Sequence, residues 1–259
     1  MMIKKHTALA ISISTLFSSP AALANTQDSD WELSFEPYLQ ATAIQGDATI
    51  GRVGEAPVHV EFSDILDTLD NGIMFHGEAY NKATHWGIAL DYAYMDLRDS
   101  ANVANTGTVS ARVRQGVLEA LAFKRFEYGD HIVDYFGGIR WWDNDISASI
   151  SSEHLPGDIN AEHDEDWVDA VIGARYWYSL NKDWKLNLRA DVGGFGLESD
   201  FTSVVYAGAE YKATDSISIK VGYKATWVDY KNDQSSGEPG HFEYDTVTKG
   251  PVLGAVFKF

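Results

Sequence analysis

Charged side chains occur at alternate positions in several stretches of this 259-residue chain. Lys185, Arg189 and Asp191 alternate with apolar residues, and Lys220 and Lys224 alternate with Ile, Val and Tyr residues. Such alternation places the charges on one face of a β-strand and the apolar residues on the other. Acids and bases on facing strands attract each other, so the chemistry that these residues predict is charge pairing.

The turns between neighbouring strands determine which of these charges face each other. A first turn places Arg175 opposite Arg189. A two-residue turn at Ser199-Asp200 then places Glu210 opposite Arg189, and the next turn places Glu210 opposite Lys220. The predicted belt of interleaved charge consists of Arg175, Arg189, Asp191, Glu210, Lys220 and Lys224.

The same arithmetic predicts two further pairs, with His76 opposite Asp91 and Glu119 within diagonal reach of Arg140. A histidine beside an acid can serve a hydrolase, but no serine nucleophile joins this pair convincingly. The chain has no Cys, and His154 and His163 in the 148–166 connection lack a metal-ligand spacing. We therefore predict no catalytic residue, no metal site and no cofactor.

About ten strands with period-two alternation position these residues. The predicted strands are Trp31 to about Gly46, Gly72–Lys82, His85–Leu97, Val109–Phe126, His131–Ser147, Trp167–Leu180, Trp184–Leu197, Phe201–Ala213, Ile217–Tyr230 and Phe242–Phe259. Each is long enough to cross a bilayer when tilted, which takes about 9–11 residues. Their apolar, aromatic-rich faces are expected to contact lipid, so the charged faces line a lumen.

The connections between these strands alternate between short and long. The short ones are Asn81–Thr84, Glu127–Asp130, Asn181–Asp183 and Thr214–Ser216, and the long ones are 47–71, 98–108, 148–166 and 231–241. Short turns at one end and longer loops at the other are typical of a transmembrane antiparallel up-and-down β-barrel. The sequence therefore predicts an all-β barrel of about ten strands, with eight or twelve as alternatives if residues 47–71 pair differently.

The N-terminal residues have the layout of a cleaved secretory signal peptide. Lys4 and Lys5 precede an apolar stretch, and Ala22-Leu23-Ala24 forms a small-x-small cleavage site. Residues 1–24 are thus expected to be removed, leaving 25–259 as the mature barrel. Cleavage changes the net charge from −18 to −20, which argues against nucleic-acid binding.

The last ten residues, Gly250–Phe259, alternate regularly and end on an aromatic side chain. This ending resembles the closing strand of bacterial outer-membrane β-barrels. The resemblance extends over the mature chain and points to the small-barrel branch, without matching a family of assigned substrate. It implies the outer membrane of a Gram-negative bacterium as the location, with Phe257 and Phe259 as the signal read by the outer-membrane assembly machinery.

Ten strands lie close to the width at which side chains fill the lumen. We therefore predict a structural or surface-interaction barrel with a charge-paired, largely filled lumen. The alternative is a narrow porin-like channel for cations or small polar solutes. An enzyme, either an omptin-like protease or a lipid hydrolase, is the third and least favoured reading.

Two of the long connections bear on this choice. Residues 58–70 show helical spacing of apolar residues, so a short helix there could enter the lumen as a plug or lie on the rim. The 148–166 connection carries six acids and no Lys or Arg, which predicts an acidic extracellular loop. Such acids could bind lipopolysaccharide through divalent cations. The sequence predicts neither a ligand nor an oligomeric state.

Overall fold

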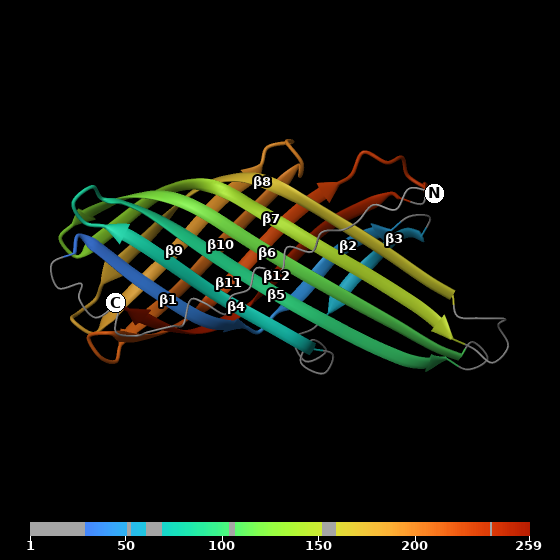
Figure 1. Cartoon of the computed structure of the whole chain (residues 1–259), viewed down its shortest axis with the longest axis horizontal. Coiled ribbons are helices and arrows are strands. Elements are labelled where there is room, and N and C mark those ends of the chain that lie inside the picture. Colours follow the sequence, from blue (N-terminus) through green and yellow to red (C-terminus); the bar gives the residue numbers. More distant parts are fainter. Residues whose placement is uncertain (1–28, 51–52, 61–68, 104–106, 152–158, 239) are drawn as a thin grey trace.

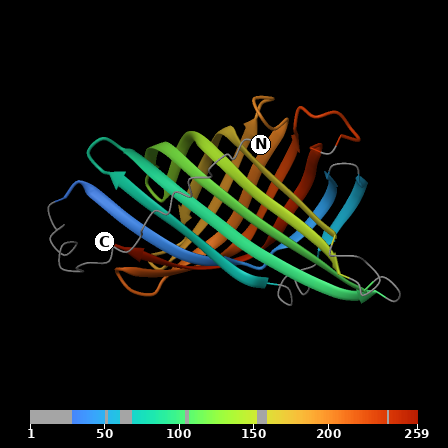
Figure 2. The same cartoon turned by 45° about the vertical axis from the view of Figure 1, so that its right-hand side comes forward.

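The chain forms a closed antiparallel β-barrel in the computed structural model, which describes residues 29–50, 53–60, 69–103, 107–151, 159–238 and 240–259. The described strands form one sheet in the order β1-β4-β5-β6-β7-β8-β9-β10-β11-β12-β2-β3, and β1 also pairs with β12. That pairing closes a ring of ten strands (Figures 1 and 2). The prediction of an all-β barrel of about ten strands is confirmed.

The strands differ in length. They are β1 Trp31–Gln40, β2 Ala43–Ile50, β3 Val53–Val60, β4 Leu69–Asn81, β5 Trp86–Val103, β6 Gly107–Tyr128, β7 His131–Ser151, β8 Ile159–Ser179, β9 Trp184–Gly194, β10 Phe201–Lys212, β11 Ile217–Lys231 and β12 Phe242–Lys258. The four predicted short turns all lie between these strands at one end, which we call the short-turn end. The opposite end is called the loop end.

β1 and β2 follow one another along the same neighbour. β1 pairs with β12 from Ser34–Lys258 to Gln40–Val252, and β2 continues from Ala43–Lys249. Between them the amide of Ala41 still donates to the carbonyl of Pro251 at 2.8 Å. Together β1 and β2 therefore form one wall of the ring, while β3 pairs with β2 and stands outside the ring of ten.

The predicted loops are shorter than expected at the loop end. Residues 47–60 of the predicted 47–71 loop belong mostly to the β2–β3 hairpin, which extends the wall. Val58 to Val60 lie in β3 and residues 69–70 in β4, so a helix over all of 58–70 is wrong. The central part, 61–68, lies outside the described residues, and so does the question of a plug there. Strands likewise occupy most of 98–108 and 148–166.

The outward face is apolar, as expected for a face in contact with lipid. Ile88, Ile172 and Leu253 each expose more than half of their surface. Aromatic side chains such as Trp86 and Trp184 also face outward near the short-turn end. Among the described residues, no helix is long and apolar enough to cross a bilayer.

The barrel wall has an uneven height. β6, β7 and β8 contain 22, 21 and 21 residues, whereas β9 and β10 contain 11 and 12. The far ends of the long strands extend well beyond the rest of the molecule, at the right of Figure 1, opposite the short turns and the C-terminal end. About 9–11 residues suffice to span a membrane, so the long strands project beyond it at the loop end.

Candidate functional site in the barrel lumen

Four charged side chains cross-link the middle of the lumen. Arg140 of β7 has no exposed surface and lies 2.6 Å from Glu119 of β6 and 2.9 Å from Asp191 of β9. Arg189 of β9 lies 2.8 Å from the same glutamate and 2.6 Å from the same aspartate. Arg140 also donates to the hydroxyl of Thr202 at 2.8 Å. Two acids and two bases therefore alternate around one cluster, which we call the central cluster.

A second group of two acids and two arginines lies closer to the short turns. Asp134 and Glu78 each accept from both Arg125 and Arg175, at 2.8–3.0 Å. Glu78 lies on β4 and Arg175 on β8, so this contact spans the lumen rather than joining neighbouring strands. The carbon at the centre of the Arg175 guanidinium also lies 4.5 Å from the ring centre of Phe123. We call Glu78, Arg125, Asp134 and Arg175 the lower cluster. These four residues connect opposite walls of the barrel.

His76, Asp91, Tyr38 and Lys224 form a third group. The Tyr38 hydroxyl donates to Asp91 at 2.8 Å, and Nδ1 of His76 lies 3.2 Å from the other oxygen of the same carboxylate. Lys224 approaches Asp91 at 3.7 Å from across the lumen. A histidine, an acid and a phenol are thus collected at one place, and no serine hydroxyl among the described residues bonds to this histidine.

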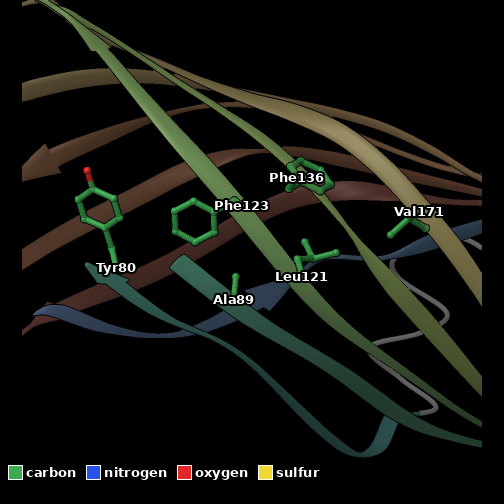
Figure 3. Packing of buried hydrophobic residues seen from close by; sticks show 6 residues of the cluster. All are labelled: Tyr80, Ala89, Leu121, Phe123, Phe136 and Val171. Atoms are coloured by element: carbon green, nitrogen blue, oxygen red, sulfur yellow. The ribbon is translucent and has the colours of Figure 1, made fainter. Parts of the chain in front are cut away.

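Apolar side chains separate the charged clusters along one wall. The sticks in Figure 3 come from β4 to β8 and comprise Tyr80, Ala89, Leu121, Phe123, Phe136 and Val171. The Phe123 ring lies over Gly87, where an added Cβ would come within 2.2 Å of the ring. The small residue on β5 therefore makes room for the large one on β6, and this wall is packed like a core.

The loop end of the lumen holds stacked aromatic rings. Trp167 of β8 stacks on Tyr230 of β11 with ring centres 3.9 Å apart, and on Trp142 of β7 at 5.6 Å. Phe242 and Tyr244 of β12 join them, and all five side chains are at most 7% exposed. We call these five residues the aromatic cluster. Gln115 of β6 donates to the Tyr244 hydroxyl at 3.1 Å, so this layer also spans the lumen.

The connection between β9 and β10 is joined to the aromatic cluster through Asp169. The amide and hydroxyl of Ser199 both donate to Asp169, at 3.1 and 2.6 Å, and the Trp167 indole donates to the other oxygen of that acid at 3.2 Å. Ser199 and Asp169 have no exposed surface. The low wall at β9 and β10 is therefore closed by the loop itself.

The lumen is open only in its short-turn half, as far as the described residues define it. A cavity of about 620 Å³ runs from Asp215, Ser216 and Phe259 at the short-turn mouth up to Asp91 and Arg189. We call this cavity the vestibule. A second cavity of about 50 Å³ lies beyond it and shares Asp91 as a lining residue. The vestibule is therefore a polar chamber at the short-turn end of the barrel. The central cluster and then the aromatic cluster lie between it and the loop end.

No protein-family model matches the chain, and no curated protein matches it. Among solved structures, the outer membrane protease OmpT from Escherichia coli is similar with a TM-score of 0.51 and 12% identity, over 90% of this chain and 98% of that chain. The translocator domain of the autotransporter NalP from Neisseria meningitidis gives 0.49 and 11%, over 88% of both chains. Ail of Yersinia pestis gives 0.34 and 12%, over 89% of this chain and 98–99% of that one.

The match to OmpT over nearly the whole chain, with a ten-strand ring, decides the fold. The chain folds as an outer-membrane β-barrel. At 12% identity the likeness to OmpT concerns the fold alone, so the roles of the lumen residues have to come from this barrel's own geometry.

Most of the predicted register is correct. His76 pairs with Asp91, Glu119 pairs directly with Arg140, and Glu210 pairs with Lys220. Each of these pairings follows from a short turn or from strands that keep a simple alternation. Arg175 also stands opposite Arg189, as the turn predicted, and each of these arginines binds acids from other strands.

One predicted pairing is wrong. Glu210 stands opposite Lys185, and Arg189 stands opposite Tyr206. The expected two-residue turn at Ser199-Asp200 is part of a longer connection, which begins with left-handed backbone at Gly194, Phe195 and Gly196. The longer connection shifts the register of β10 on β9 by four residues relative to the tight turn.

The predicted belt is divided among several contacts instead of forming one ring. Arg175 belongs to the lower cluster, whereas Arg189 and Asp191 belong to the central cluster. Lys220 pairs with Glu36 at 2.9 Å. Glu210 pairs with Lys258 at 2.7 Å, and Lys224 with Asp91.

Sequence reasoning missed five charged residues of the lumen. They are Glu36, Glu78, Arg125, Asp134 and Lys258. Their inward positions follow from the same period-two alternation and could have been found from it. Their partners could not, because the contacts between β4 and β8 and between β1 and β11 join strands that are not neighbours in the sheet.

Proposed function

We propose that this protein is a structural or surface-interaction barrel of the outer membrane, with a lumen closed to passive flow. The observation that carries the proposal is the complete burial of Arg140 between Glu119, Asp191 and Thr202. These three partners hold a large side chain in place inside the lumen, and the aromatic cluster adds a second layer beyond it. Ten strands are narrow enough for side chains to span them.

The orientation that we propose follows from the two ends. Outer-membrane barrels have short turns on the periplasmic side and longer extensions outside. The short-turn end, and with it the vestibule, would face the periplasm. The long β6–β8 wall would project into the medium.

Planar bilayer recording tests the closed lumen. We expect no reproducible conductance steps from the purified, heat-modifiable barrel in about 1 M KCl. At this ionic strength surface charges are screened within about 3 Å. The matched variant carries Trp142→Ala and Trp167→Ala, which removes two of the five rings of the aromatic cluster. We expect this variant to show more frequent current leaks across the bilayer. Regular steps from the wild-type protein would refute the proposal.

A narrow channel is the second candidate, because the vestibule is a sizeable cavity of about 620 Å³. It would require side chains between the two cavities to move, since Asp91, Lys224 and Val204 line both of them. The same recordings, repeated across a voltage range, decide between the two functions.

We propose a non-enzymatic role. His76 and Asp91 form a histidine–acid pair, but both are held by further partners, Tyr38 and Lys224 among them. Among the described residues no serine hydroxyl bonds to the histidine, so a covalent mechanism of the serine-hydrolase type has no nucleophile at this place. An activity lost on His76→Ala with the fold intact would contradict this role.

The projecting wall is the surface that we propose for interaction. Asp145, Glu162 and Asp164 present carboxylate oxygens within 4.8 Å of one another on β7 and β8. Burial, with the nearby Asp166 and Asp145, raises the pKa of Asp143 on the same wall. Crowded acids of this kind favour divalent cations, which supports contact with lipopolysaccharide phosphates. Calcium-dependent retention of lipopolysaccharide by the purified barrel tests the idea.

A further inference from the structure

The carboxylates of the vestibule are engaged by bases. Glu36 pairs with Lys220 at 2.9 Å, Glu78 with Arg175 at 2.8 Å, and Glu210 with Lys258 at 2.7 Å. Deeper in, Asp91 accepts from Tyr38 and approaches His76. These four acids are therefore compensated within the wall, whereas Glu127, which lines the same chamber, accepts from the Tyr80 hydroxyl at 3.4 Å.

The hydrogen-bond donors of the β9 wall are not compensated in the same way. Asn187 lines the vestibule and is 3% exposed, yet neither its amide nitrogen nor its carbonyl oxygen has a hydrogen-bond partner in the described structure. An unpaired buried amide is destabilising in proteins, so such groups are normally paired. Asn187 stands opposite Trp177 on β8 and Gly208 on β10, where no side chain supplies that partner.

Lys185 lies two residues before Asn187 on the same inward face and also lines the vestibule. In the described part of the chain its ammonium group makes neither a hydrogen bond nor an ion pair within 4 Å, although Glu210 stands opposite it. That acid is held by Lys258 instead. The β9 wall thus presents an ammonium group next to a carboxamide, and the chamber provides room in front of them.

We propose that the vestibule binds a small organic carboxylate that carries hydroxyl groups, through Lys185 and Asn187. The ammonium group of Lys185 matches the carboxylate, and the carboxamide of Asn187 turns toward the ligand to donate and accept. The volume of about 620 Å³ lies within the range of small-molecule sites, roughly 300–1,000 Å³. Ser34 and Ser216 line the same chamber and offer hydroxyl groups.

Binding here does not depend on whether the lumen conducts. A ligand that enters by the short-turn mouth reaches Lys185 and Asn187 without passing the central cluster. Conductance would overturn the proposed closed lumen and leave this site standing, whereas loss of binding would overturn the site alone.

Isothermal titration calorimetry on the full, folded barrel in detergent provides the test, with D-gluconate as the probe. Glucitol has the same hydroxyl groups without the carboxylate, and acetate has the carboxylate without the hydroxyl groups. We expect gluconate to bind at least about tenfold more tightly than either, since a charge-assisted hydrogen bond contributes about 1.5–3 kcal/mol.

Two variants and one control assign the contact. Lys185→Met and Asn187→Leu should each weaken gluconate binding about tenfold. Lys182→Met, in the exposed turn that precedes β9, should leave it unchanged. Asn187→Leu should also preserve or raise the unfolding midpoint of the free barrel, because it removes an unpaired amide.

The midpoint separates a binding role from a structural one. An asparagine that only supports the fold would lower the midpoint when replaced. The proposal fails if gluconate binds no better than glucitol and acetate. It also fails if both vestibule variants bind gluconate as the wild-type protein does.

Discussion

Arg140 shows how a single lumen residue combines several requirements. Its guanidinium satisfies two acids and a hydroxyl from three other strands, and none of its surface is exposed. Removing one member of a buried ion pair costs about 3–5 kcal/mol because the remaining charge is left without compensation. Arg140 thus stabilises the fold mainly by compensating the buried charges of Glu119 and Asp191.

We expect Arg140→Met to lower the free energy of unfolding by about 3–5 kcal/mol, since Glu119 and Asp191 would then share Arg189 alone. Adding Glu119→Gln should restore part of that loss, because Arg189 and Asp191 remain as a balanced pair. Urea unfolding in detergent micelles, followed by tryptophan fluorescence, measures Arg140→Met, Glu119→Gln and the double variant. A double variant whose loss equals the sum of the two single losses would show that the cluster has no coupling.

Glycines and aromatic rings on neighbouring strands fit one another in the barrel wall. The Tyr206 ring of β10 lies over Gly222 of β11, where an added Cβ would meet ring atoms at 2.4–2.6 Å. At Gly116 of β6 the nearest atoms would be 3.7 Å away, an ordinary contact. The glycine is needed in the first position and tolerated in the second.

Gly222→Ala should therefore destabilise the barrel by about 1–3 kcal/mol, the usual cost of overpacking. Gly116→Ala is the matched control and should change the midpoint little. Combining Gly222→Ala with Tyr206→Leu should cost less than the two changes added together, because the ring that clashes is gone. The gel shift between unboiled and boiled samples at rising temperature reports each midpoint. Equal midpoints for the two alanine variants would contradict the packing argument.

The properties of individual strands and turns explain which pairings could be predicted from the sequence. His76 and Asp91 are joined by a short turn, and the lipid-facing residues between them must be apolar, so the alternation is clear and the pairing was predictable. Residues 47–50 and 53–60 lie in β2 and β3, but their sequence shows no period-two alternation from which strands could be predicted. Glu210 was misplaced because Gly194 to Gly196 start a loop whose length the sequence does not reveal. The contact of Glu78 with Arg175 could not be predicted, because these residues lie on strands that approach each other only when the ring closes.

At the scale of the whole molecule, the two halves of the lumen differ. The short-turn half contains an open chamber, and the loop half is filled by charges and aromatic rings. The strand that begins the ring and the strand that ends it meet beside the chamber, where the amide of Phe259 donates to the carbonyl of Leu33 at 2.9 Å. The Phe259 side chain itself is half-exposed and lies at the mouth of the chamber.

Phe259→Ala should consequently have little effect on the finished barrel and a large effect on its delivery. We expect an unfolding midpoint within about 0.5 kcal/mol of the wild type after refolding in detergent, as for most surface substitutions. The amount of heat-modifiable barrel in the outer membrane of expressing cells should fall several-fold. Leu253→Ala, another outward-facing change on β12, is the control. Equal membrane levels for Phe259→Ala and the wild type would remove the residue from the assembly signal.

The pairing of β1 with β12 has a consequence for folding kinetics. Ser34 meets Lys258, so the last hydrogen bonds of the ring join residues that are far apart in the sequence. Ring closure must therefore await complete synthesis, and the entropy of bringing such distant segments together slows the step. Until it occurs, β1 and β12 have unpaired edges that invite association with other chains. A chaperone that covers those two edges would protect the protein during its most vulnerable interval.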